Sequence, residues 1–289
     1  MGCANLLCQT RVHDFIVDNR TMTTPTGQYA EFLSPDKHRF RAFVASPSSP
    51  PRAALVLLHE MDSRSANRVH SGAPANPMPG LSQRIRALVS EHASRGYLVV
   101  APSLFGRGRA GQDHGYQFQM GFSGEQLVQP LQPVDSSRAM MDVQTVLAWA
   151  QGEVGQGRVG VMGFCWGGLL AWQAACTLPQ VFAAASFYGG GMTLAPMHSG
   201  RPKCPVLVHL PSHGAWMTQT SMDEFVAAQR EHFAAHGVVS PAQKSPMVQI
   251  ERYEAAYGFD HAGSRQHDPM ASQTAKLKTS AFLDKYLKI

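Results

Sequence analysis

The chain has 289 residues, 44% of them hydrophobic and 16% charged, which is typical of a folded globular protein and excludes a largely disordered one. Lys and Arg outnumber Asp and Glu by 25 to 20, but the basic residues are scattered, without a run interleaved with aromatic residues, so no nucleic acid partner is expected. No stretch approaches the ~18 consecutive apolar residues of a membrane span, so no membrane partner is expected either.

The first predicted elements are strands. Residues 1–20 carry little hydrophobic pattern and are expected to form an N-terminal extension, which leaves residues 21–289 as the folded domain. Two short strands are predicted at 28–33 and 39–46, on either side of a turn. The continuous apolar run AALVLLHE, residues 53–60, is typical of a central parallel strand that is covered on both faces.

Strands and helices alternate over the rest of the chain. Further strands are predicted at residues 97–103, 158–164, 182–189, 205–210 and 248–255, and helices at residues 81–96, about 136–150, 167–178, 222–237 and 272–287. This alternation predicts an α/β fold in a single domain, with a mostly parallel central sheet and helices on both faces. Two long loops, residues 64–80 and 104–133, follow strand ends, and loops of that length in a compact domain are more often functional than accidental.

The segment GFCWGG, residues 163–168, lies where a predicted buried strand turns into a helix. Gly163, Cys165 and Gly167 keep the G-x-S-x-G spacing of a nucleophile elbow, with cysteine in place of serine. The start of the following helix favours a thiolate, and the backbone N–H of Trp166 would point at a developing oxyanion. The alternative is a cysteine that only fills space in a tight turn. The glycine spacing favours the nucleophile.

Five cysteines are present, an odd number without a CxxC pair or a zinc-like spacing. This usage predicts a reducing compartment, and hence a cytoplasmic protein, rather than a disulfide framework. No metal is expected. His232 and His236 stand four residues apart on a predicted helix, but no third ligand is nearby and a surface role is favoured.

GFCWGG, preceded by LLHE and APSLFGR and followed by FYGGG, resembles the dienelactone hydrolases of the α/β-hydrolase superfamily over residues 25–289. The resemblance implies an α/β-hydrolase fold and the opening of enol lactones and related small esters by a Cys-His-Asp triad without a cofactor. It implies no particular oligomeric state for this chain.

The resemblance also implies roles for single residues. Cys165 matches the nucleophile, and Glu60 matches a glutamate that contacts the thiol in the resting enzyme. The backbone of Met61, with that of Trp166, would form the oxyanion hole. Arg107 matches an arginine that holds a substrate carboxylate, although a solvated loop arginine is equally compatible with the sequence. Independently of the resemblance, a carboxylate such as Glu60 at the end of a buried strand is costly without a partner.

Two triad positions depart from the family pattern. Gly214 stands where the aspartate is expected, and Tyr257-Gly258 stand where the histidine is expected. Three explanations remain open: His261 reaches Cys165 as the base, His213 serves from another strand end, or hydrolysis is lost. Catalysis is favoured, because a thiol ionises readily and tolerates a missing acid better than a hydroxyl does. His261 is preferred as the base for its reach and its role.

The acid itself stays unassigned: it could be Asp260, Asp223 or no residue at all. The sequence thus predicts a hydrolase of small esters or lactones with Cys165, His261 and Glu60 as catalytic residues. A catalytically silent homologue that binds a small ligand in the same pocket is the alternative. A redox-responsive cysteine is a third possibility, but no resolving cysteine is placed to support it.

Overall fold

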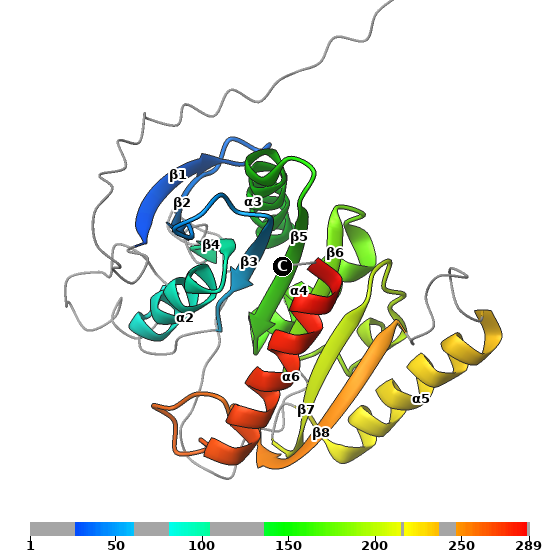
Figure 1. Ribbon diagram of the computed structural model, residues 1–289. Helices are drawn as coiled ribbons and strands as arrows, with labels where there is room; N and C mark the ends of the chain where they lie inside the picture. Colours follow the sequence, from blue (N-terminus) through cyan, green and yellow to red (C-terminus); the bar gives the residue numbers. More distant parts are fainter. Residues whose placement is uncertain (1–26, 61–80, 105–135, 215–216, 237–246, 288–289) are drawn as a thin grey trace, which may run out of the picture.

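The computed structural model describes residues 27–60, 81–104, 136–214, 217–236 and 247–287, except for the side chains of 233–236. Within these ranges the strands form a single eight-stranded sheet in the order β1-β2-β4-β3-β5-β6-β7-β8 (Figure 1). The strands are β1 Gln28–Leu33, β2 Arg39–Ala45, β3 Ala53–Leu58, β4 Tyr97–Pro102, β5 Arg158–Phe164, β6 Val181–Phe187, β7 Val206–His213 and β8 Val248–Ala256. Strand β2 is antiparallel to β1 and β4, and every other neighbouring pair is parallel, which confirms the predicted fold class.

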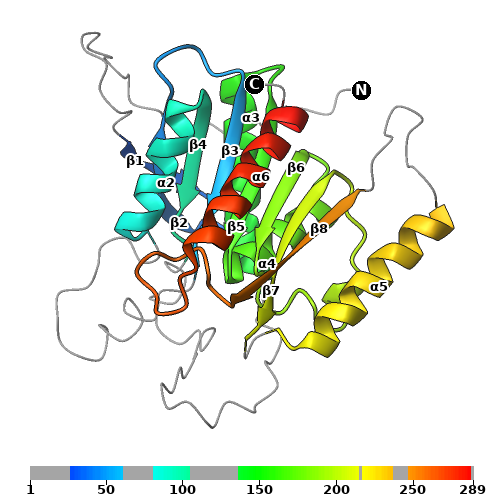
Figure 2. The ribbon, with the colours of Figure 1, turned by 60° about the horizontal axis from the view of Figure 1, so that its bottom comes forward.

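Helices cover both faces of the sheet. They are α2 Gln83–Ser94, α3 Ser137–Val154, α4 Trp166–Thr177, α5 Gln219–His236 and α6 Pro269–Leu287, with a short 3-10 helix η2 at Met197–Ser199. Helices α2 and α6 lie on one face, and α3 and α4 lie on the other (Figures 1 and 2). Helix α5 packs beside α4, where the rings of Trp172 and Phe225 meet edge to face at 5.1 Å.

The centre of the sheet is the core of the molecule. All six residues of β3 and all six of β4 are buried, as their continuous apolar runs predicted. Each fully buried Val or Leu contributes roughly 1.5–3 kcal/mol. The site described below therefore stands on the most stable part of the sheet.

Strand β7 is longer than the sequence predicted. The prediction ended it at Leu210. In the structure β7 continues to His213, since β8 pairs with it across an irregularity between Pro211 and His213. The extension places Gly214 directly after the strand.

The carboxyl ends of β3, β5, β6, β7 and β8 meet at one edge of the sheet, because these strands are parallel. In an open α/β sheet this edge is where ligands bind. The residues that follow these strands come from five distant parts of the sequence: 59–60, 165, 188–190, 214 and 257–261.

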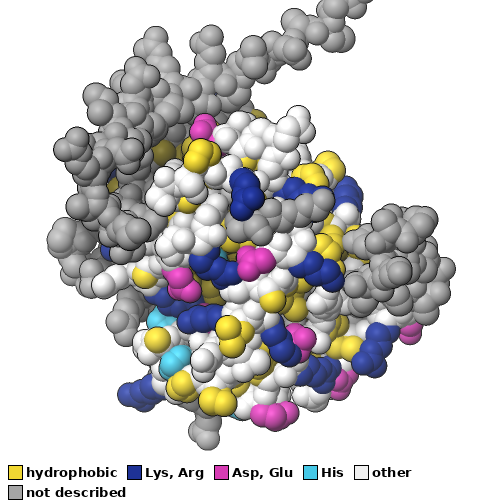
Figure 3. Space-filling view, viewed as in Figure 1, with side chains coloured by type: hydrophobic (Ala, Val, Ile, Leu, Met, Phe, Trp, Pro, Cys, Tyr) yellow, Lys and Arg dark blue, Asp and Glu magenta, His cyan; other side chains and the backbone are white. Residues whose placement is uncertain are grey.

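The surface carries charges of both signs. On the face shown in Figure 3, lysine and arginine side chains are spread among acidic ones rather than gathered in one patch. None of the helices in the described part of the chain is long and apolar enough to span a bilayer.

Candidate active site

Cys165 occupies a strained turn between β5 and α4. Its backbone has φ 52° and ψ −118°, in the left-handed half of conformational space that non-glycine residues rarely adopt. The turn is held on both sides, because the Cys165 N–H donates to the Phe187 carbonyl at 3.0 Å and the Cys165 carbonyl accepts from Gly190 at 3.1 Å. Such strain persists only where the surroundings enforce it, and it presents the half-buried thiol at the carboxyl edge of the sheet.

The two glycines of the elbow are needed for close packing. A methyl group on Gly163 would overlap the carbonyl oxygen of Gly167, and one on Gly167 would overlap the carbonyl oxygen of Leu58. The first turn of α4 therefore lies directly against β3 and β5. The spacing that suggested an elbow in the sequence is the spacing that this contact requires.

Gly167→Ala is expected to destabilise the protein, because backbone atoms of β3 cannot move aside for the new methyl group. We expect a loss of about 2–3 kcal/mol, as in overpacked cores, and a lower melting temperature in thermal unfolding. Gly152→Ala is the matched control. A methyl group there meets nothing within 4 Å on an exposed turn of α3, so it is expected to stabilise by about 0.5–1 kcal/mol. Equal effects of the two substitutions would contradict this account of the elbow.

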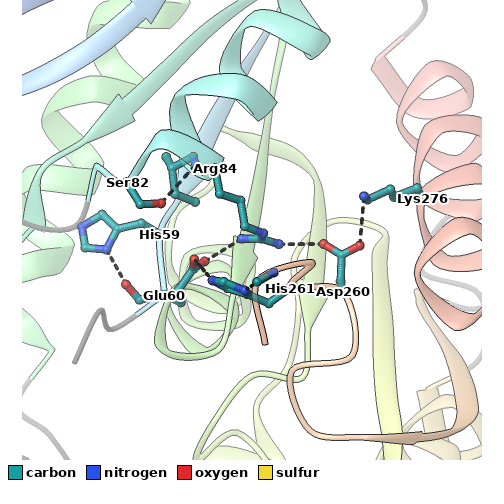
Figure 4. Close-up of polar contacts among 9 residues, drawn as sticks. His59, Glu60, Ser82, Arg84, Asp260, His261 and Lys276 are labelled. Carbon is teal, nitrogen blue, oxygen red and sulfur yellow. Dashed lines mark hydrogen bonds and ion pairs between the residues drawn. The ribbon is translucent and has the colours of Figure 1, made fainter. Parts of the chain in front are cut away.

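Glu60 follows β3 and is tied to a charged network (Figure 4). Arg84, from the first turn of α2, places its Nη1 2.8 Å from Glu60 Oε2 and its Nη2 2.6 Å from Asp260 Oδ2. One guanidinium group thus joins two carboxylates that are 200 residues apart in the sequence. A carboxylate at the end of a buried strand is costly without a partner, and Arg84 is the partner of Glu60.

Asp260 is the most deeply buried member of this network, with 2% of its surface exposed. Its Oδ1 accepts from the Ser272 hydroxyl at 2.6 Å and lies 3.4 Å from the Lys276 ammonium. Because both of its oxygens have partners, the charge of Asp260 is compensated without solvent. Of the two acids named from the sequence, Asp260 is joined to Glu60 through Arg84, whereas Asp223 forms an exposed pair with Arg252.

The network also determines the state of Arg84. Burial alone would lower the pKa of its guanidinium, but the charges of Glu60, Tyr188 and Asp260 and the hydrogen bond to Asp260 outweigh burial, and the pKa is raised. The guanidinium lies 4.3 Å from the centre of the Phe164 ring, one residue before the elbow. Arg84 is therefore a permanent cation that holds Glu60 in place at the end of β3, beside β5.

His59 supports the end of β3 from the opposite side. Its Nε2 accepts from the Leu104 N–H at 3.1 Å, so its Nδ1 carries the proton and donates to the Glu60 carbonyl at 2.8 Å. The ring thereby links the ends of β3 and β4 and fixes the backbone of Glu60.

His261 lies in the turn after β8, and its ring faces Glu60 (Figure 4). Its Nε2 is 3.8 Å from Glu60 Oε1, and its Nδ1 accepts from the Gly263 N–H at 3.2 Å. The structure brings this predicted base to the carboxylate. His213 is exposed, and its Nδ1 lies 2.9 Å from the hydroxyl of the neighbouring Ser212.

The side chain of Tyr257 reaches Cys165. Its hydroxyl forms a hydrogen bond with the side chain of Cys165. Burial raises the pKa of Tyr257 well above its ordinary value, and the charge of Cys165 and the hydrogen bond to it act in the same direction. The phenol is therefore protonated and donates to the sulfur. Its ring packs on that of Tyr188, with centroids 5.2 Å apart.

The remaining predicted positions divide into two groups. Trp166 is buried at the start of α4, and its ring centroid is 6.3 Å from that of His59. Met61 and Arg107 lie outside the described residues. In the described part of the chain, no group of three or more His, Cys, Asp or Glu side chains could hold a metal ion.

Sequence reasoning missed Arg84 and underrated Tyr257. Arg84 stands four residues before Leu88 on the apolar face of α2, and a charged residue at a core-facing position is the signal that could have marked it. Tyr257 was identified only as a departure from the expected histidine. The Tyr257 phenol contacts the Cys165 side chain, and Glu60 and His261 place a carboxylate and an imidazole 3.8 Å apart at the same edge of the sheet. A phenol, a carboxylate and an imidazole are groups able to activate a nucleophile and move its proton.

Comparison with known proteins agrees with this geometry. The family model described as the dienelactone hydrolase family matches residues 75–287. Carboxymethylenebutenolidase from Pseudomonas putida is 25% identical over 250 residues, covering 86% of this chain and 92% of the relative's length. Among solved structures, a dienelactone hydrolase-like promiscuous phosphotriesterase from metagenomic libraries has a TM-score of 0.61 at 16% identity, covering 90% of this chain and 99% of that chain. A Pyrococcus furiosus esterase has a TM-score of 0.57 at 14% identity, covering 94% and 98%, so both share the fold.

Proposed function

The chain belongs to the dienelactone hydrolase family, and from that membership we propose that it hydrolyses small esters or lactones with Cys165 as the nucleophile. Membership of a hydrolase family implies a small-molecule substrate. The observation that carries the proposal is the positive φ of Cys165 at the elbow, since strain of this kind on a non-glycine residue is characteristic of functional sites.

In the first step the Cys165 sulfur attacks the carbonyl carbon of the ester while Glu60 accepts the thiol proton. The carbonyl oxygen becomes an oxyanion, which the backbone N–H groups of Met61 and Trp166 would stabilise. The C–O bond then breaks, the leaving alkoxide takes the proton from Glu60, and the acyl group remains on Cys165 as a thioester.

In the second step water hydrolyses the thioester. Water loses a proton to the pair formed by Glu60 and His261, attacks the thioester carbon, and expels the Cys165 thiolate together with the carboxylic acid. The partial exposure of His261 and its 3.8 Å contact with Glu60 suit it for passing this proton to solvent. Arg107 is proposed to hold a carboxylate where the substrate carries one.

The described cysteines support the proposed compartment. None of Cys165, Cys176 and Cys204 is in a disulfide bond. In a reducing compartment, cysteine thiols are usually not joined in disulfides. We therefore propose that the protein is cytoplasmic.

The proposal is tested by incubating the protein with p-nitrophenyl acetate and following its intact mass over seconds to minutes. We expect one acetyl group to appear on the peptide that contains Cys165 and then to disappear as acetate is released. An adduct that persists indefinitely would contradict hydrolysis, because the thioester would then be an end point. A complete lack of adduct would favour the silent binding protein.

A further inference from the structure

Tyr257 reaches Cys165 because of where β8 ends. Its backbone N–H donates to the His213 carbonyl at 2.9 Å, which continues the pairing between β7 and β8 by one residue. The ring then lies against Tyr188, and the hydroxyl lies over Gly190, whose own N–H donates to the Cys165 carbonyl at 3.1 Å. Backbone contacts on both sides therefore place the phenol oxygen beside the thiol.

Two glycines leave the space that the Tyr257 ring occupies. A Cβ atom on Gly214 would lie 2.5 Å from the Tyr257 Cβ, and a Cβ atom on Gly190 would lie 2.8 Å from the Tyr257 hydroxyl. Real Cβ atoms essentially never show contacts below 3.0 Å. An aspartate at position 214 and the observed placement of Tyr257 therefore exclude each other, and the two departures from the expected triad are a single structural change.

The surroundings of the phenol decide what it can do. Cys165, Tyr188 and Glu60 are the groups that act on it, and each disfavours its ionised form. Tyr188 is held protonated in the same way, chiefly by its own burial. The phenol is thus a hydrogen-bond donor at the nucleophile and accepts no proton from it.

We infer that Tyr257 is a catalytic residue of this site, whose hydroxyl donates to the Cys165 sulfur and stabilises it as a thiolate. The inference deepens the proposed function, on which its catalytic meaning rests. The thiol proton passes to the Glu60 carboxylate, the phenol keeps its own proton, and the sulfur gains a donor in addition to the start of α4.

A donor-only partner has a kinetic consequence. A histidine at this position would take a proton from the attacking water, whereas the Tyr257 phenol leaves that task to Glu60 and His261. The donor at the sulfur assists both the attack of the thiolate and its departure from the thioester. Activation of the water is left to Glu60 and His261, so these two residues rather than Tyr257 are expected to set the rate at which water attacks the thioester.

Alkylation by iodoacetamide tests the inference without an ester substrate. Its rate at the Cys165 peptide, followed by mass spectrometry from pH 5 to about pH 10, reports the thiolate fraction. In Tyr257→Phe we expect the pH midpoint to rise by about one to two units, since a hydrogen bond to a charged group is lost. Tyr253→Phe is the matched control, because it removes another hydroxyl of β8, which lies 2.8 Å from His209 Nδ1, and it should leave the midpoint unchanged.

Gly214→Ala gives a second route that keeps the hydroxyl. The new methyl group displaces the Tyr257 ring, so the midpoint should rise as in Tyr257→Phe, and this variant decides the matter if the first does not fold. An unchanged midpoint in either folded variant overturns the inference, even in an active hydrolase. A raised midpoint in a protein without esterase activity would support Tyr257 and refute hydrolysis instead.

Discussion

Cys165→Ala is expected to lower kcat/KM for p-nitrophenyl acetate by on the order of 10⁴-fold or more, as loss of a nucleophile does in other covalent hydrolases. The backbone strain at φ 52° remains for alanine, so the fold should survive while the acyl acceptor is gone. The measurement is initial rates over a range of ester concentrations, with the melting temperature as a check on folding.

Cys176→Ala is the matched control, because Cys176 lies near the other end of the same helix α4. Burial raises the pKa of the Cys176 thiol to about 12, so it is protonated at neutral pH and contributes no thiolate. Its replacement should leave the rates unchanged. If Cys165→Ala keeps esterase activity while Cys176→Ala loses it, the proposed nucleophile is wrong.

Arg84→Met is expected to destabilise the protein by about 3–5 kcal/mol, the usual cost of breaking a buried ion pair from one side. The substitution keeps an apolar stem against Phe164 but leaves Asp260, among the described residues, with the more distant Lys276 as its cation. Activity should fall as well, because Glu60 loses the guanidinium that orients it. Thermal unfolding and ester kinetics measure the two effects separately.

Two variants make this result specific. Arg252→Met removes the cation of an exposed ion pair, with Asp223, and is expected to leave the melting temperature unchanged. Arg84→Lys keeps the charge but lacks the planar fork that contacts Glu60 and Asp260 together, so its stability should lie between those of the wild type and Arg84→Met. If Arg84→Met is as stable as Arg252→Met, the network does not hold the site together.

The fold could be predicted because its signals are local. Continuous apolar runs at residues 53–58 and 97–102 identify strands buried on both faces, and Gly163 and Gly167 mark the contact of α4 with its neighbours. These features depend on residues that are close in sequence. For the same reason the sequence alone places Cys165 at the end of a strand.

The surroundings of Cys165 could not be predicted in the same way. Arg84 and Asp260 are separated by 176 positions, and only the packing of α2 against the sheet edge brings them together. The exclusion between Gly214 and Tyr257 likewise follows from two strand ends that pair through β7 and β8. A motif compares positions along the chain, whereas these contacts depend on distances across the fold.

The strand order has a further consequence for the growing polypeptide. From β5 onward each new strand is added at the edge of the preceding one, so the sheet widens in the order in which the ribosome delivers it. A nascent chain that ends at His213 already contains the elbow and Glu60, but neither Tyr257 nor Asp260 exists yet. The Cys165 sulfur therefore acquires its phenol partner only after β8 has been synthesised and paired with β7, so a shorter nascent chain would hold the elbow without the Tyr257 hydrogen bond.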